Sequence, residues 1–259
     1  MKRYDISFIG AGRVGEALCT EFFKKGHKIL QIASKGTENS RSLAAQCSAE
    51  WITNLHFDKP ADIIFVCVPD NDLPDVLGKI ECGENTIVTH TAGSFGLEVF
   101  PSAILFKGVF YPLQTFSKGR NINFQEVPLF IEASDNTSRD LLKAIAESIS
   151  DRIYESDVTQ RRIVHLAAVF ASNFVNYMIL LSKQICTTAS FSFDIMTPLI
   201  KETVKKAIET DPELAQTGPA VRNDTETIRK HMDLLSFSPE IRKIYEVISK
   251  SIMEYYRNR

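Results

Sequence analysis

The spacing of hydrophobic residues alternates between two patterns over the first 156 positions. Short, continuous runs of apolar and often β-branched residues are typical of strands buried on both faces of a sheet. Between these runs, apolar residues recur every three or four positions, as they do along one face of a helix. The predicted strands are residues 4–9, 28–34, 51–53, 62–68, 86–90, 108–111, 127–133 and 152–154. The predicted helices are residues 16–25, 41–47, 73–80 and 138–150.

After Asp157 only the helical pattern continues, and it predicts helices over residues 158–189, 195–209, 225–235 and 239–256. Strands that alternate with helices indicate a doubly wound, mainly parallel α/β sheet of the Rossmann type. We therefore predict a Rossmann-like domain over residues 1–156 and an all-helical domain for substrate binding and dimerisation over residues 157–259. Substrates usually bind in clefts between domains, so we expect the substrate to bind in a cleft between these two predicted domains.

The first predicted strand leads directly into the glycine-rich sequence GAGRVG. A lone G-x-G-x-x-G pattern is weak evidence, but a preceding strand and a following helix are the context of a dinucleotide-binding loop. In such loops the first glycine permits the tight turn, the second leaves bare main chain beside the pyrophosphate, and the third lets the helix pack closely on the strand. The cofactor contacts predicted here are Gly10, Ala11, Gly12, Arg13, Val14 and Gly15.

The end of the second predicted strand indicates which nucleotide binds. Sites that prefer NAD carry an acidic residue there, which binds the ribose 2′-hydroxyl. In this chain the strand ends at Ser34 and Lys35, and the next acidic residue is Glu38. We therefore predict NADP rather than NAD, with Ser34 and Lys35 as contacts and with added positive charge from Arg13 and Arg41. A solvated loop lysine is the alternative interpretation of Lys35.

Three further loops follow predicted strands, and they read VPDND, HTAGS and YPLQTF. Functional residues collect at the carboxyl ends of strands in open α/β sheets. We expect Val68, Pro69 and Thr91 to contact the cofactor, and Ser94 and Gln114 to contact the substrate. Turn formation alone is an equally good explanation for any one of these residues.

Residues 163–181 form an apolar stretch about long enough to cross a bilayer. Polar side chains within it, His165 and Asn173 among them, would be costly in lipid, so we expect a buried central helix instead. Helical spacing places His165 and Asn173 on roughly one stripe. We predict His165 as the general acid or base, Asn173 as a residue that positions the substrate, and His90 as the second candidate for proton transfer. Mutual structural pairing of these polar groups is the alternative.

The sequence TGPAVRND joins a turn to an arginine and an acid. Arg222 is a candidate clamp for a carboxylate or phosphate of the substrate. Asp224 precedes a predicted helix, so we expect it to act as the N-cap of that helix.

Composition and charge argue against several classes of protein, namely nucleic-acid-binding, disulfide-bonded and zinc-binding proteins. The chain has 259 residues and a formal net charge of −2, so it lacks the broad basic field of a nucleic-acid-binding protein. Its five cysteines include no C-x-x-C pair, which predicts neither a disulfide framework nor a zinc site and favours the reducing cytoplasm. No metal is expected.

In this order, the sequences GAGRVG, VCVPDNDL, HTAGS, YPLQTF, HLAAVFASN and TGPAVRND resemble a bacterial family assigned as NADP oxidoreductases. The family has a Rossmann-like N-terminal half and a helical C-terminal domain of unknown function, and the resemblance covers nearly the full length. It is similar to the wider group of 6-phosphogluconate dehydrogenase, 3-hydroxyisobutyrate dehydrogenase and pyrroline-5-carboxylate reductase, whose helical domains commonly form dimers. The resemblance implies a dinucleotide site and a homodimer, but it supplies no substrate.

Two departures from these patterns matter. Asn223 stands where the family usually has glycine, and asparagine also tolerates left-handed backbone geometry. The β-hydroxyacid dehydrogenases carry a lysine and an asparagine one turn apart at the start of the long helix, and this helix has no such pair. Their mechanism is therefore not transferred to this chain.

The leading hypothesis is an NADP(H)-dependent oxidoreductase that moves hydride between nicotinamide and a small carbonyl, imine or hydroxyl-bearing substrate. The alternative is a sensor or regulatory protein that binds NADP(H) without turnover, which the missing lysine and asparagine pair would favour. A third hypothesis is an imine reductase, which needs less acid chemistry from side chains because a protonated imine already accepts hydride.

Overall fold

The computed structural model describes residues 2–36 and 38–257. Contacts within the chain separate two compact units, one that extends to Asn173 and one that begins at Phe174. The division falls inside the long helical segment that follows Asp157.

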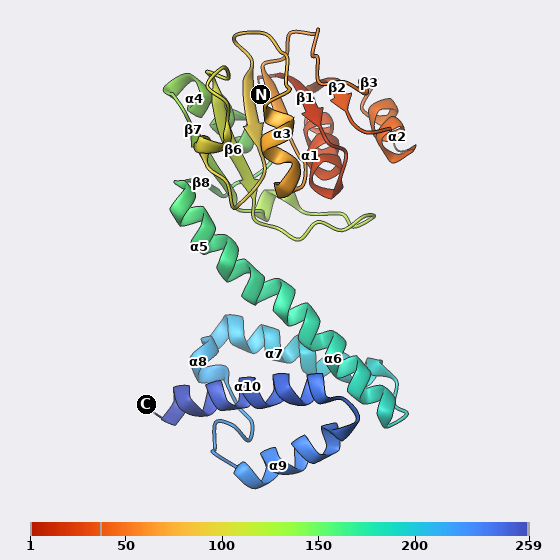
Figure 1. Cartoon of the computed structure of the whole chain (residues 1–259), viewed down its shortest axis with the longest axis vertical. Helices are drawn as coiled ribbons and strands as arrows, with labels where there is room; N and C mark the ends of the chain where they lie inside the picture. The colour runs from red at the N-terminus through yellow and green to blue at the C-terminus, as the bar shows by residue number, and fades with distance from the viewer. Residues whose placement is uncertain (1, 37, 258–259) are drawn as a thin grey trace. The chain divides into compact units, whose positions relative to one another are not determined.

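The first unit is built on one eight-stranded sheet with the strand order β3-β2-β1-β4-β5-β6-β7-β8 (Figure 1). Its strands are β1 (Asp5–Ile9), β2 (Lys28–Ala33), β3 (Glu50–Ile52), β4 (Ile63–Val66), β5 (Ile87–His90), β6 (Lys107–Pro112), β7 (Leu129–Ala133) and β8 (Ile153–Glu155). β7 pairs antiparallel to β6, and the other neighbours pair in parallel. The order of the first six strands is that of dinucleotide-binding sheets, so the predicted Rossmann-type fold is confirmed.

Helices cover both faces of this sheet. The helices of the first unit before residue 157 are α1 (Arg13–Lys24), α2 (Glu38–Gln46), α3 (Leu73–Leu77) and α4 (Asn136–Glu147). Successive strand residues point to opposite faces, so Phe65 packs in the core under α1 and α4 while Ile64 packs in the core under α3. Phe65 lies 5.3 Å from Phe8, 5.2 Å from Phe22 and 5.2 Å from Phe110, measured between ring centroids. This aromatic cluster joins α1 to the middle of the sheet.

The remainder of the described chain is helical. Its α-helices are α5 (Val158–Ala168), α6 (Val175–Thr188), α7 (Thr197–Thr210), α8 (Pro212–Ala215), α9 (Thr225–Leu234) and α10 (Pro239–Arg257). A π-helical segment, η4 (Val169–Phe174), joins α5 to α6, and neither it nor the short α8 was predicted. Asp224 accepts a hydrogen bond from the Thr227 backbone N–H at 3.0 Å, which confirms it as the N-cap of α9. Asn223 has a φ of 53°, a left-handed conformation that asparagine tolerates.

The expectation that the long apolar helix is buried within the chain is wrong. Val158–Thr188 spans 31 residues, its most apolar 18-residue stretch has a mean hydropathy of 1.7, and none of that stretch is buried. Ile163 and Leu166 are 64% and 58% exposed. The helix is therefore long and apolar enough to cross a membrane, a criterion that core helices of soluble proteins also meet. Hydropathy indicates that a segment avoids water, but it does not identify the surface that covers it.

Candidate functional site

The three glycines of the loop differ in the space that surrounds them. Gly10 has a φ of 91°, and a side chain there would run into the backbone carbonyl of Cys67. A side chain at Gly15 would run into the carbonyl of Gly10, because α1 packs directly against the loop. At Gly12, by contrast, an added Cβ meets nothing within 4 Å. Only Gly12 therefore leaves the main chain open to a ligand.

A cavity of about 640 Å³ extends from this loop across the ends of β2 and β4, a volume typical of ligand sites. Of the predicted cofactor contacts, the following line it: Gly10, Ala11, Gly12, Ser34, Lys35, Val68 and Pro69. α1 begins beside the cavity, and its N-cap Gly12 provides no side-chain hydrogen bond. The first N–H groups of α1 therefore remain available to an anion, and the residues present fit a dinucleotide pyrophosphate.

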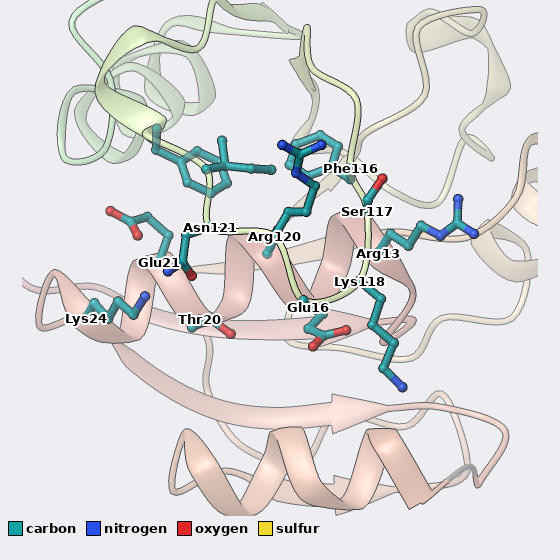
Figure 2. A pocket seen from close by; sticks show the side chains of 14 residues that line it. Arg13, Glu16, Thr20, Glu21, Lys24, Phe116, Ser117, Lys118, Arg120 and Asn121 are labelled. Carbon is teal, nitrogen blue, oxygen red and sulfur yellow. The ribbon is translucent and has the colours of Figure 1, made fainter. Parts of the chain in front are cut away.

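The other predicted cofactor residues do not line this cavity. Arg13 lines a second cavity, which shares no lining residue with the first (Figure 2). Val14 is half-buried, Gly15 is buried, and the Thr91 side chain forms a hydrogen bond with Cys67. The guanidinium of Arg41 lies 4.4 Å from the centroid of the Trp51 ring.

The end of β2 is fixed by a side-chain contact. Trp51 donates its indole N–H to the Ser34 hydroxyl at 2.9 Å. This contact joins β3 to the segment that precedes α2, and it places Ser34 and Lys35 at the rim of the cavity.

A second cluster lies at the carboxyl ends of β4, β5 and β6. The Tyr111 hydroxyl of β6 is 3.0 Å from Nδ1 of His165 on α5. Gly93 permits this approach, because a Cβ there would lie 3.0 Å from the Tyr111 ring and 3.2 Å from His165 Nδ1. Beside the pair, the Ser94 hydroxyl donates to the Asp70 carboxylate. The structure thus brings together two predicted residues, His165 and Ser94, with two that the sequence analysis did not identify.

Burial, followed by the negative charge of Asp70, raises the pKa of Tyr111 above its usual value. The phenol therefore stays protonated at neutral pH, so it can donate its hydrogen to Nδ1 in the tautomer of His165 that accepts there. A neutral imidazole that accepts at Nδ1 carries its own proton on Nε2. Within residues 2–36 and 38–257, Nε2 of His165 has no protein partner. In that tautomer the pair offers the Nε2–H group of His165 to a ligand.

The position of His165 depends on the start of α5. Arg161 is fully buried, lies 2.6 Å from a Glu132 carboxylate oxygen of β7, and donates to the Phe95 carbonyl at 2.8 Å. Arg162 donates to the Ser94 carbonyl at 2.7 Å. These contacts hold the first turn of α5 against the loop that follows β5, one turn before His165.

His90 occupies a different place from His165. It is fully buried, accepts the Ala92 backbone N–H at Nδ1 over 3.2 Å, and lies 3.4 Å from the Gly96 carbonyl at Nε2. Its ring stacks on Phe100. Burial lowers the pKa of His90 to about 4, so the ring is neutral at physiological pH. In this arrangement the buried His90 ring contacts the backbone of the HTAGS turn at Ala92 and, just after it, at Gly96.

The remaining predicted site residues lie apart from this cluster. Asn173 ends the first unit and lies within η4. A π-helical turn holds more residues than an α-helical one, so α-helical spacing alone does not fix the angle between His165 and Asn173 around the helix. Gln114 accepts the Thr115 backbone N–H at 2.7 Å. Arg222 is exposed in the second unit.

The sequence analysis missed Tyr111 and Asp70 although it identified the loops that contain them. Both residues directly follow or end apolar strands, in YPLQTF and VPDND. Position at a strand end was the available signal. The contact between Tyr111 and His165 joins residues 54 positions apart, and only the fold reveals it.

Comparisons with known proteins agree with these observations. Residues 5–93 match the family described as NADP oxidoreductase, coenzyme F420-dependent, and residues 127–252 match a domain of unknown function, DUF2520. No curated protein matches the chain. Among solved structures, an inferred NADP oxidoreductase from Bacteroides fragilis is 40% identical, with a TM-score of 0.92 and coverage of 97% of this chain and 98% of that one.

Two further structures share the fold. The Thermotoga maritima protein TM1727 is 24% identical with a TM-score of 0.73, over 98% of both chains. An imine reductase from Myxococcus stipitatus, solved with NADP+, is 16% identical with a TM-score of 0.68, over 98% of this chain and 93% of that one. The match to the Bacteroides fragilis protein covers nearly the full length of both chains, and the two family models match the two parts of this chain. We conclude that this chain is an oxidoreductase of the family in which an NADP oxidoreductase domain (coenzyme F420-dependent) is followed by a DUF2520 domain.

Proposed function

We propose that the protein transfers hydride between NADP(H) and a small substrate that carries a carbonyl, imine or hydroxyl group. The observation that carries this proposal is the contact between Tyr111 and His165 at the carboxyl ends of the strands. An oxidoreductase of this kind needs a proton donor or acceptor beside the atoms that exchange hydride.

The cavity at the glycine loop is the proposed cofactor site. Gly12 and the N-terminus of α1 would bind the pyrophosphate, and Ser34 and Lys35 would bind the adenosine ribose and its 2′-phosphate. Val68 and Pro69 would line the path of the dinucleotide along the ends of the strands. The bound nicotinamide supplies the hydride, and the protein supplies binding, orientation and the proton.

His165 is the proposed acid and base. Tyr111 fixes its ring by donating to Nδ1, so that the Nε2 proton faces outward and can pass to a substrate oxygen or nitrogen during reduction. In the oxidative direction, the same Nε2 would accept the proton of a hydroxyl. Ser94 and Asp70 would orient the polar group of the substrate. Asn173, Gln114 and Arg222 are further proposed substrate contacts, and His90 is proposed to hold the loop rather than to transfer protons.

The test is a screen of the purified protein with NADPH against aldehydes, ketones, keto acids and cyclic imines. We expect NADPH consumption with at least one class, and slower turnover with NADH. Binding of NADPH without consumption across the panel would contradict the proposal and identify a sensor.

Variants of the pair test its role once a substrate is known. We expect His165→Gln to lower kcat about 100-fold or more, the usual contribution of a positioned acid or base, and Tyr111→Phe to lower it by a smaller factor. The Kd for NADPH should stay unchanged in both. Tyr154→Phe, at an exposed tyrosine of β8, is the matched control. Turnover of His165→Gln equal to that of the wild type would exclude His165 from proton transfer.

A homodimer formed through the helical residues is also part of the proposal. All but three of the exposed large hydrophobic side chains among the described residues lie after Asp157. A second copy of the same chain presents the same apolar surface and can cover it symmetrically. We place this soluble dimer in the cytoplasm.

A further inference from the structure

A loop between β6 and the short helix η3 (Phe124–Glu126) lies over α1 (Figure 2). We refer to residues 115–123 as the 115–123 loop. It encloses, with α1, a cavity of about 230 Å³ whose lining includes Arg13 and Glu16 from α1 and Lys118 and Arg120 from the loop. This cavity is separate from the one at the glycine loop.

Apolar contacts anchor both ends of the 115–123 loop. Phe116 and Ile122 are half-buried and pack against the main core, and the Phe116 ring lies 6.1 Å from that of Phe124. Residues 117–121 between these anchors are exposed and polar. The tip is therefore held in one region of the molecule while its side chains remain accessible to a ligand.

Lys118 connects this loop to the proposed cofactor cavity. Its Nζ lies 3.0 Å from Oδ1 of Asn39 in α2. Asn39 lines the glycine-loop cavity together with Ser34 and Lys35. A residue far along the chain thus reaches the rim of the cavity at the end of β2. In Figure 2 the Arg120 side chain points away from that of Lys118.

Cations lie near the end of β2, and two carboxylates, Asp72 and Asp75, line the same cavity from the segment formed by η1 (Asp70–Asp72) and α3. Arg13, Lys35 and Lys118 are exposed, and no carboxylate of the described residues forms an ion pair with any of them. The acidic residues on the same elements are Glu16 in α1 and Glu38 at the start of α2. Among the residues that the structure describes, the ammonium of Lys118 has a neutral amide oxygen as its only partner. A phosphate would be a stronger partner, because both groups of the hydrogen bond would then be charged.

Building on the proposed function, we propose that Lys118 binds the 2′-phosphate of NADP(H) jointly with Lys35. The adenosine ribose of a dinucleotide lies beside the end of the second strand, where a cation accommodates the 2′-phosphate. Lys35 comes from that strand end, and Lys118 reaches the same rim from the 115–123 loop. Two cations from separate elements would then distinguish NADP from NAD, which lacks this phosphate.

The experiment measures binding, so it does not depend on turnover. NADPH and NADH are titrated by fluorescence, and adenosine 2′,5′-bisphosphate is titrated by calorimetry, against the full-length wild type and Lys118→Ala. Arg120→Ala removes a cation from the same loop and is the matched control. We expect Lys118→Ala to raise the Kd for NADPH and for the bisphosphate about tenfold or more, the usual loss of one charged hydrogen bond, and to leave the Kd for NADH unchanged. Arg120→Ala should leave all three unchanged.

The other outcomes separate this inference from the proposed function. If the wild type binds neither NADPH nor the bisphosphate, both the proposed function and the role of Lys118 fail. If the wild type binds NADPH and Lys118→Ala binds it equally well, the proposed function stands and the role of Lys118 is overturned. An equal loss of NADH affinity, or an equal effect of Arg120→Ala, would also overturn it, because neither result depends on contact between Lys118 and the 2′-phosphate.

Discussion

At the scale of single residues, the glycines of the loop show that one motif serves two purposes. Gly10 and Gly15 are required by the protein itself, because carbonyl groups occupy the space that a side chain would fill. Gly12 is not required by the protein, because the space around it is open. Fold stability and ligand binding should therefore respond to different members of the motif.

Gly15→Ala should lower the free energy of unfolding by about 1–3 kcal/mol, the usual cost of overpacking, because its Cβ meets the Gly10 carbonyl. Gly12→Ala should keep wild-type stability and raise the Kd for NADPH, because its Cβ would stand between the main chain and the pyrophosphate. Urea unfolding and fluorescence titration measure the two effects. Wild-type affinity in a folded Gly12→Ala would place the pyrophosphate elsewhere.

His90 should make the fold sensitive to acid. Its pKa is about 4 in the folded chain and about 6.5 in an unfolded one, so between these values the unfolded state takes up a proton that the folded state excludes. Stability should therefore fall, by up to about 3 kcal/mol, as the pH drops from about 6.5 to about 4. His27, whose pKa burial also lowers, adds to the same trend.

Urea unfolding at several pH values measures this slope. His90→Asn retains an acceptor for the Ala92 N–H but removes the titrating ring, so its slope should be smaller. The control, His56→Asn, exchanges an exposed histidine. An identical slope in His90→Asn and in the wild type would assign the acid sensitivity to other groups.

At the scale of elements, the start of α5 determines whether His165 reaches Tyr111. Arg161 ties α5 to β7 through Glu132 and to the loop after β5 through the Phe95 carbonyl. In the sequence, a single basic residue before an apolar helix carries no functional signal. Its role follows from complete burial, which only the packed structure shows.

Arg161→Met should lower the free energy of unfolding by about 3 kcal/mol or more, because it leaves the Glu132 carboxylate without its partner in a largely buried position. Arg162→Met is the matched control. Its partner Glu98 is exposed, so the loss of that ion pair together with the hydrogen bond to the Ser94 carbonyl should cost less, about 1–2 kcal/mol. Equal losses in chemical denaturation would show that burial does not distinguish the two pairs.

At the scale of the whole molecule, the exposed apolar helix Val158–Thr188 requires a covering surface. The proposed homodimer supplies one. Leu166→Asp should shift the protein from dimer to monomer in sedimentation velocity, because it places a charge within the apolar surface. Glu226→Lys, a charge change on α9, should leave the dimer intact. A monomeric wild type, or cosedimentation of the wild type with phosphatidylcholine vesicles, would contradict the dimer.

The fold class could be predicted because local patterns encode it. Buried strands such as Ile63–Val66 are uniformly apolar, amphipathic helices such as α1 show helical spacing, and a glycine motif marks the junction of β1 and α1. These properties depend on neighbours in the chain, so the sequence by itself determined the order of the elements, the Rossmann-type sheet and the position of the glycine loop.

Only the tertiary structure decided which distant residues meet. The contact of Tyr111 with His165, the burial of Arg161 and of His90, and the reach of Lys118 to Asn39 all join segments that lie apart in the sequence or depend on full packing. The same is true of the long helix, whose most apolar stretch, with Ile163 and Leu166, is exposed rather than buried. Hydrophobicity and residue type state what a side chain requires, but packing alone determines which group satisfies that requirement.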